Sequence, residues 1–118
     1  MIAEILSTGD EIRSGAILDS NAAYISQKLE EAGLPVIRHN CVGDEIDILV
    51  SVLEEIGSRT DIAVVTGGLG PTMDDLTAEA AAKAAKVELV LNDNALSSIK
   101  SFYSSKNRPM PVLSEKMA

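Results

Sequence analysis

The stretch Val64-Val65-Thr66-Gly67-Gly68-Leu69-Gly70-Pro71-Thr72-Met73-Asp74-Asp75-Leu76-Thr77 decides the fold of this chain. It predicts an apolar strand that breaks into a glycine-rich loop, with acidic residues at the start of an alanine-rich helix. Gly67, Gly68 and Gly70 lack a Cβ atom, so the backbone amides of the loop can approach a ligand closely. A loop and a helix N-terminus that point to one place suit an anion. Because two aspartates beside the loop would repel a bare phosphate, the pattern favours a phosphate that carries a divalent cation.

Strand and helix patterns alternate along the rest of the chain. Strands are expected at 2–6, 36–42 and 61–66, with a shorter fourth strand at 87–91. Helices are expected from a cap at Asn21 to residue 32, from 46 to a stop at Gly57, from Asp74 or Asp75 to Lys86, and over 94–105. This order predicts an α/β fold of three layers, αβα, with a mainly parallel sheet in one domain over 1–118. The strand at 61–66 is the most apolar, which favours the middle of the sheet, and the residues from 106 onward match no element and read as a tail.

Composition and charge limit the classes of partner. The 118 residues include 18 acidic and 10 basic side chains, a formal net charge of −8, and no run of Lys or Arg, which disfavours nucleic acid. No stretch approaches the ~20 apolar residues of a membrane span, and the N-terminus has no basic leader, so a cytoplasmic protein without a membrane partner is expected. The single Cys41 reads as a small buried strand residue rather than a nucleophile.

Three polar segments are expected to meet at one rim of the sheet. They are 7–11, 43–45 and 67–75, and each follows a predicted strand. Ligands of parallel α/β sheets bind at the carboxyl ends of the strands, so this convergence is the main argument for a site. His39 lies in the middle of a strand, away from the rim, and a structural role is favoured for it. No Ser-His-Asp, CxxC or HxH pattern supports acyl chemistry or a zinc site.

Several rim residues have a structural alternative to a ligand role. Of Asp74 and Asp75, one is expected to complement the helix dipole and the other to point into the site. Thr77 could equally bond back to the helix terminus, and Asp44 could equally cap the helix that follows it. Asp10 reads equally as a ligand or metal contact and as part of a solvated loop.

A family resemblance adds to these patterns. Thr8-Gly9-Asp10-Glu11, with Gly15, Asp19 and Asn21, and above all the glycine motif 66–77 resemble the molybdopterin-binding (MoaB/MogA-like) superfamily. Leu69 with Pro71-Thr72 and the paired aspartates most resembles the N-terminal domains of the CinA (competence/damage-inducible) family, and 43–45 and 108–111 fit in order and spacing. The resemblance implies a MogA-like fold over essentially the whole chain. Because that family continues past residue 118, the resemblance also implies a domain that is incomplete at its C-terminus. The deamidase activity of full-length members is not expected of these 118 residues, because it belongs to a separate C-terminal domain in that family.

The resemblance also implies a function and its residues. CinA N-terminal domains are associated with hydrolysis of ADP-ribose at its diphosphate, so a metal-dependent hydrolase is expected. In the wider superfamily the aspartate that closes the glycine motif and the one after the second strand belong to the pterin or adenylyl site, which here implies Asp75 and Asp44 as catalytic residues. Mg²⁺ is expected on Asp75, Asp44 and Asp10. The ligand-binding residues are expected to be Gly67, Gly68, Gly70, Thr72, Thr8, Gly9 and Thr77.

A pterin-binding module that holds molybdopterin for cofactor assembly, without hydrolysis, is the alternative. Leu69 argues mildly against it, because the cofactor-assembly branch more often has Thr at that position. A homo-oligomer, a dimer or trimer, is expected from the resemblance and from an unpaired strand at the sheet edge.

Overall fold

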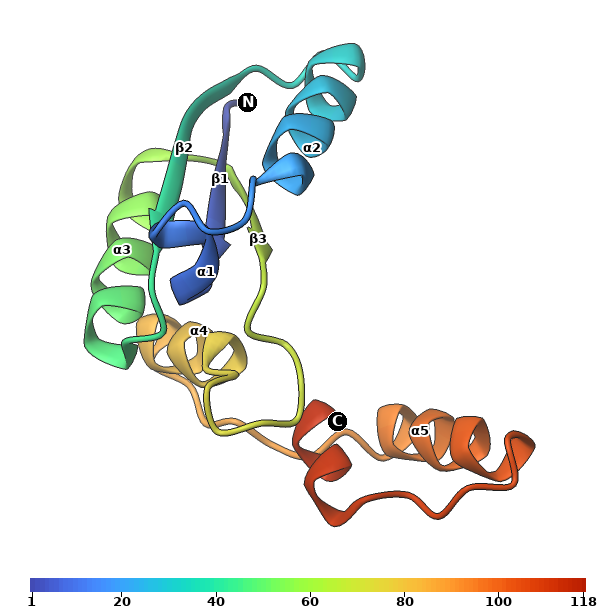
Figure 1. Cartoon of the computed structure of the whole chain (residues 1–118). Coiled ribbons are helices and arrows are strands. Elements are labelled where there is room, and N and C mark those ends of the chain that lie inside the picture. The colour runs from blue at the N-terminus through green and yellow to red at the C-terminus, as the bar shows by residue number, and fades with distance from the viewer.

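The protein is described by a computed structural model of residues 1–118, in which an alternating first part leads into two C-terminal helices (Figure 1). The elements in chain order are β1 (Ala3–Thr8), α1 (Asp10–Arg13), α2 (Ser20–Glu31), β2 (Val36–Val42), α3 (Ile46–Arg59), β3 (Ile62–Thr66), α4 (Thr77–Ala85), α5 (Asp93–Ser105) and the 3-10 helix η1 (Val112–Met117).

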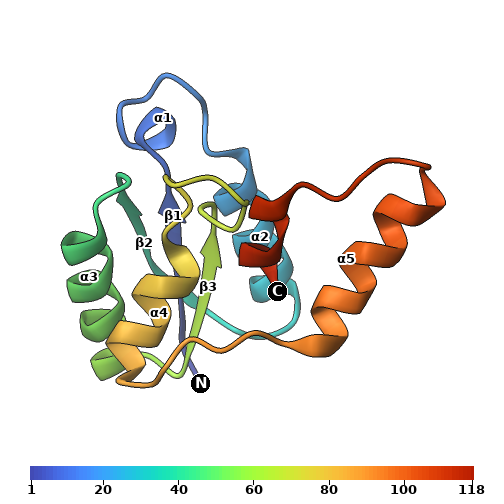
Figure 2. The ribbon, with the colours of Figure 1, turned by 90° about the horizontal axis from the view of Figure 1, so that it is seen from below.

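The three strands form one parallel sheet in the order β2-β1-β3. Figure 2 shows α3 and α4 together on one face of this sheet and α2 on the other. In the register, Ile5 of β1 lies opposite His39 of β2 and Val64 of β3. The predicted three-layer αβα fold with a parallel sheet is confirmed.

The middle strand is β1, so the prediction that 61–66 occupies the centre is wrong. All six residues of β1 are buried, whereas β3 pairs on one side only and is partly exposed. Apolar content shows that a strand is covered, but it does not fix the order of strands in a sheet. No strand forms at 87–91 either, and the sheet has three strands.

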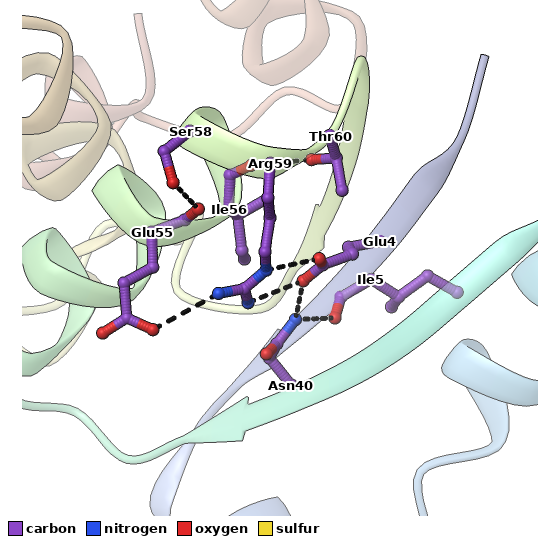
Figure 3. A network of polar contacts seen from close by, with 8 residues as sticks. All are labelled: Glu4, Ile5, Asn40, Glu55, Ile56, Ser58, Arg59 and Thr60. Atoms are coloured by element: carbon purple, nitrogen blue, oxygen red, sulfur yellow. Dashed lines mark hydrogen bonds and ion pairs between the residues drawn. The ribbon is translucent and has the colours of Figure 1, made fainter.

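A buried polar network fixes the end of α3 against the sheet (Figure 3). The fully buried carboxylate of Glu4 accepts hydrogen bonds from Arg59 Nε at 2.6 Å and Nη2 at 2.9 Å. Asn40 Nδ2 of β2 donates to the same carboxylate at 2.8 Å. The paired guanidinium lowers the pKa of Glu4 below its ordinary value, against the opposing effect of burial. A charged bidentate pair of this kind joins α3, β1 and β2 at one point.

Helix termini differ from the predicted ones where side chains find other partners. Asp19, rather than Asn21, caps α2, because its Oδ1 accepts from the Ala22 amide at 3.0 Å. Gly57 does not end α3, which continues to Arg59, since a glycine inside a packed helix costs only about 1 kcal/mol. Asn92 caps α5, two residues before the expected start.

The C-terminal segment, residues 93–117, contains two helices. α5 confirms the helix expected over 94–105, whereas the residues expected to form a tail include the 3-10 helix η1. In Figure 1 α5 and η1 lie beside each other and away from the sheet. Tyr103 Oη and Ser114 Oγ are 3.4 Å apart, and the Asn92 amide donates to the Ala118 carbonyl at 2.8 Å. None of the helices is long and apolar enough to cross a membrane.

Candidate functional site

The ends of the three strands meet at one rim, as the sequence predicts. The Gly9 amide donates to the Val42 carbonyl at 3.1 Å, which joins the segment after β1 to the end of β2. Thr8 Oγ1 donates to the Thr66 carbonyl at 3.3 Å, which joins β1 to the start of the glycine loop. The segments 7–11, 43–45 and 67–75 therefore border one face of the molecule.

The turn that opens the loop requires glycine at two positions. Gly67 and Gly68 have φ values of 89° and 63°, a region that L side chains rarely adopt. A Cβ atom on Gly67 would collide with the carbonyl oxygen of Thr8, and one on Gly68 with Oγ1 of Thr77. The two glycines let the loop lie directly against β1 and α4.

Thr77 anchors the glycine loop to the start of α4 by hydrogen bonds. It is the first residue of α4 and is buried, its Oγ1 donates to the Gly67 carbonyl at 2.7 Å, and its amide donates to the Gly68 carbonyl at 3.1 Å. Of the two roles that the sequence left open, the structure shows the structural one, because the hydroxyl proton is used within the chain.

Asp75 closes the loop into a ring with Thr72. Its Oδ2 accepts from the Thr72 amide at 2.9 Å and from Thr72 Oγ1 at 2.7 Å, and its own amide donates to the Thr72 carbonyl at 3.2 Å. These hydrogen bonds favour the charged carboxylate and lower the pKa of Asp75. The ring ties the two ends of the segment 72–75 together without a ligand.

The expected division of roles between Asp74 and Asp75 is wrong in one respect. α4 begins at Thr77, so neither aspartate lies in its first turn, and Asp74 forms no hydrogen bond or ion pair. The helix starts late because Asp75 bonds back to Thr72 in place of joining the helix. Asp74 therefore has no helix-dipole role here.

Asp10 and Asp44 bind each other's backbone across the rim. The Asp10 amide donates to Asp44 Oδ2 at 3.3 Å, and the Asp44 amide donates to Asp10 Oδ1 at 3.2 Å. Asp44 does not cap α3, because Glu45 holds the cap position. Arg13 Nε lies 3.6 Å from Asp10 Oδ1. This reciprocal pair locks the segment after β1 to the turn after β2.

The three carboxylates predicted to share a metal are not gathered into one cluster. No group of three or more His, Cys, Asp or Glu side chains lies close enough to hold an ion, so Asp75 does not join the Asp10–Asp44 pair. Magnesium in proteins is commonly bound by one or two carboxylates together with substrate phosphates and water. The donor set fits an ion that a phosphate ligand brings with it, and the Mg²⁺ site stays a prediction.

A cavity of about 390 Å³ opens on the glycine loop. Its lining combines the loop with Asp75, with α4 and with two residues of η1, and consists of Gly68, Leu69, Gly70, Asp75, Ala78, Glu79, Leu89, Lys116 and Met117. A larger cavity of about 670 Å³ lies between α3 and α4, but it contains none of the rim residues, so the smaller one is the candidate site. The sequence does not indicate that Lys116 and Met117 belong to the site, because no periodic pattern marks η1.

His39 and Cys41 both lie on β2, away from the glycine loop. His39 Nε2 lies 2.6 Å from Ser26 Oγ of α2, which confirms its structural role. Cys41 is exposed, so its predicted burial is wrong, because β2 is an edge strand whose side chains are only partly covered.

Comparison with known sequences assigns this geometry to a family. The sequence model of a family described as "probable molybdopterin binding domain" matches residues 4–117. A CinA-like protein of Desulfosudis oleivorans is 52% identical over 118 residues, which is 100% of this chain and 29% of that protein. A putative competence-damage inducible protein of Natranaerobius thermophilus is 40% identical over the same share of each chain. The chain thus spans about 29% of the length of these relatives.

Solved structures of related proteins have the same fold. A crystal structure of CinA, a protein of unknown function from Thermoplasma acidophilum, superposes with a TM-score of 0.92 at 33% identity, over 100% of this chain and 69% of that one. The molybdopterin biosynthesis enzyme MoaB of Thermus thermophilus superposes with a TM-score of 0.67 at 22% identity, over 98% of this chain and 70% of that one. The second likeness shows the fold alone, and the predicted MogA-like fold is confirmed.

Proposed function

Because this chain belongs to the family of probable molybdopterin binding domains, with CinA-like proteins among its relatives, we propose that its glycine loop binds the phosphate groups of a small ligand. The observation that carries the proposal is the preformed loop itself. The amides of Gly68 and Leu69 donate to no acceptor within the chain, while Thr72, Asp75 and Thr77 hold the loop around them. Free backbone amides on a rigid turn are suited to phosphate oxygens.

The favoured ligand is a nucleoside-diphosphate sugar of the ADP-ribose type, cleaved at its diphosphate. In this reaction a water oxygen forms a bond to one phosphorus and the bridging P–O bond breaks, which yields AMP and ribose 5-phosphate. A bound Mg²⁺ would supply charge stabilisation at the phosphoryl oxygens. The free amides of Gly68 and Leu69 would hold the diphosphate. An ion bound to the diphosphate would be held by Asp75 or by the Asp44–Asp10 pair, because the three carboxylates do not lie in one cluster. Because His39 is bonded to Ser26, a rim carboxylate must take the proton of the attacking water.

The test compares two neighbouring aspartates. The wild-type chain is incubated with ADP-ribose and Mg²⁺, and AMP is measured by chromatography on samples whose folding is checked by circular dichroism. Asp75→Asn should lower turnover at least about tenfold, since it removes the charge that Thr72 and the loop hold at the site. Asp74→Asn is the matched control and should retain wild-type turnover. Absence of AMP from the folded wild-type chain would refute hydrolysis of ADP-ribose.

A pterin-binding module is the second candidate, and the description of the matching family favours it. The same free amides would hold the phosphate of molybdopterin, and no bond would be cleaved. Calorimetric titration with molybdopterin and with ADP-ribose separates the two proposals. Binding of the pterin without binding of ADP-ribose would reverse the ranking.

A further inference from the structure

The cavity on the glycine loop contains a single cationic side chain, and it comes from the far end of the chain. Lys116 of η1 donates from Nζ to the carbonyl oxygen of Thr72, 44 residues earlier. The other charged side chains of the lining are Asp75 and Glu79. The C-terminal segment thus contributes to a site that otherwise belongs to the strand ends and α4.

The charges around this cavity make an added cation necessary for an anionic ligand. Glu79 forms an ion pair with Lys83 of the same helix, α4, at 2.9 Å, and this pair offsets its charge. Asp75 receives hydrogen bonds from Thr72 but has no ion-pair partner within 4 Å, and its carboxylate stays charged. A phosphate that approaches Gly68 and Leu69 therefore meets the field of Asp75. Lys116 lines the same cavity and can offset this charge. The hydrogen bonds from Thr72 are the main cause of the lowered pKa of Asp75, and the charge of Lys116 lowers it further.

The ammonium of Lys116 has donors to spare. A lysine ammonium carries three N–H groups, and only one of them is used, by the Thr72 carbonyl. The side chain is exposed and stands on a flexible stem, so its head can turn without moving η1. Two N–H groups remain for oxygens of a ligand in the cavity.

The backbone of η1 is anchored at its end, which keeps Lys116 within reach. The Ala118 carbonyl accepts from the Asn92 amide at 2.8 Å, and Ser114 is buried beside Tyr103 of α5. These contacts hold the residues on both sides of Lys116. The two C-terminal helices thereby place the positive charge of Lys116 beside the glycine loop.

We propose that Lys116 is a ligand-recognition residue of the glycine-loop cavity, which bonds a phosphate oxygen of the bound ligand and makes the site prefer phosphorylated ligands over neutral ones. The inference rests on the proposed function, since it presumes a phosphate ligand at the loop. It assigns the C-terminal segment a direct part in ligand selection.

The experiment titrates the chain with ADP and with adenosine, in the presence of Mg²⁺, by calorimetry. Lys116→Gln should weaken ADP binding at least about tenfold and leave any adenosine binding unchanged, because only the diphosphate loses a charged hydrogen bond. Lys116→Arg should restore part of the affinity. Lys100→Gln, which removes the same charge from an exposed position of α5, should bind ADP as the wild type does.

A footprint on the unaltered chain provides a readout that does not depend on any variant. Lysines are acetylated with and without ADP, and the rate at each is read by mass spectrometry. Lys116 should be protected by ADP, and Lys100 should not. Equal ADP affinity of the wild type and Lys116→Gln, or no protection of Lys116 while ADP binds, overturns the lysine assignment alone. A wild-type chain that binds no ADP and no ADP-ribose overturns both this inference and the proposed function.

Discussion

The sheet with its three covering helices and the C-terminal segment obey different rules. In the first region all of β1 is buried, and so are Leu49, Ile56 and Ala80 of α3 and α4. In the second, α5 has no buried residue, and Phe102 is 59% exposed. The first region is therefore stabilised by its own packing, whereas the second is held by a few polar contacts to its neighbours.

The largest test of this contrast is one substitution made in both regions. Leu6→Ala in β1 removes a fully buried side chain and should lower the free energy of unfolding by about 2–5 kcal/mol. Leu113→Ala makes the same chemical change at a residue that is 65% exposed and should cost no more than about 0.5 kcal/mol. Urea denaturation followed by circular dichroism measures both. Equal losses would mean that the C-terminal segment is as well packed as the sheet.

Acid should act on the sheet region through Glu4. Arg59 lowers the pKa of this buried carboxyl below its ordinary value of 4.5. The stability contributed by the ionised form is therefore complete above about pH 4.5 and is lost as the pH falls through the pKa of the folded state. Thermal unfolding from pH 7 to pH 3 should show this loss in the wild type.

Arg59→Met should remove the acid-dependent part of that loss, because Glu4 no longer has a charged partner to give up. Lys28→Met breaks an exposed ion pair with Glu31 on α2 and serves as the control with a wild-type pH profile. Identical pH profiles of the wild type and Arg59→Met would contradict a role for the buried pair.

Self-association should have the smallest effect on stability and should depend on the second region. We propose a homo-oligomer, a dimer or trimer, in which the exposed apolar side chains of the C-terminal segment, such as Phe102, meet a second copy. Phe102→Glu should reduce the mass measured by light scattering to that of a monomer, while Ser101→Glu, one residue away, should not. A monomeric wild type at micromolar concentration would contradict the proposal.

The spacing of apolar, glycine and capping residues predicts those elements whose structure depends on neighbouring residues in the sequence. The glycine loop, three strands and the helix after Gly43 follow from residue spacing, and so does the meeting of strand ends at one rim. Strand order does not, since β1 and β3 are both apolar and only the assembled sheet decides which is central.

Long-range partners account for the rest. Glu4 and Arg59 are 55 residues apart, and a glutamate inside an apolar strand gives no indication of the arginine that will neutralise it. The start of α4 at Thr77 does not follow from helix propensity, because Asp75 forms hydrogen bonds with Thr72 and so belongs to the loop. Lys116 lies on a short 3-10 helix, for which sequence has no reliable period.

The central place of β1 has a consequence for how the chain is made. The strand leaves the ribosome before both of its neighbours, and the second of them, β3, ends 58 residues later. At ~5–20 residues per second, synthesis leaves one edge of this strand open for roughly 3–12 s. Closing so distant a contact is slow compared with local helix formation. Substitutions that let another segment pair with the open edge of β1 during this interval should therefore reduce the yield of folded protein in cells. The free energy of unfolding of the folded protein should stay unchanged.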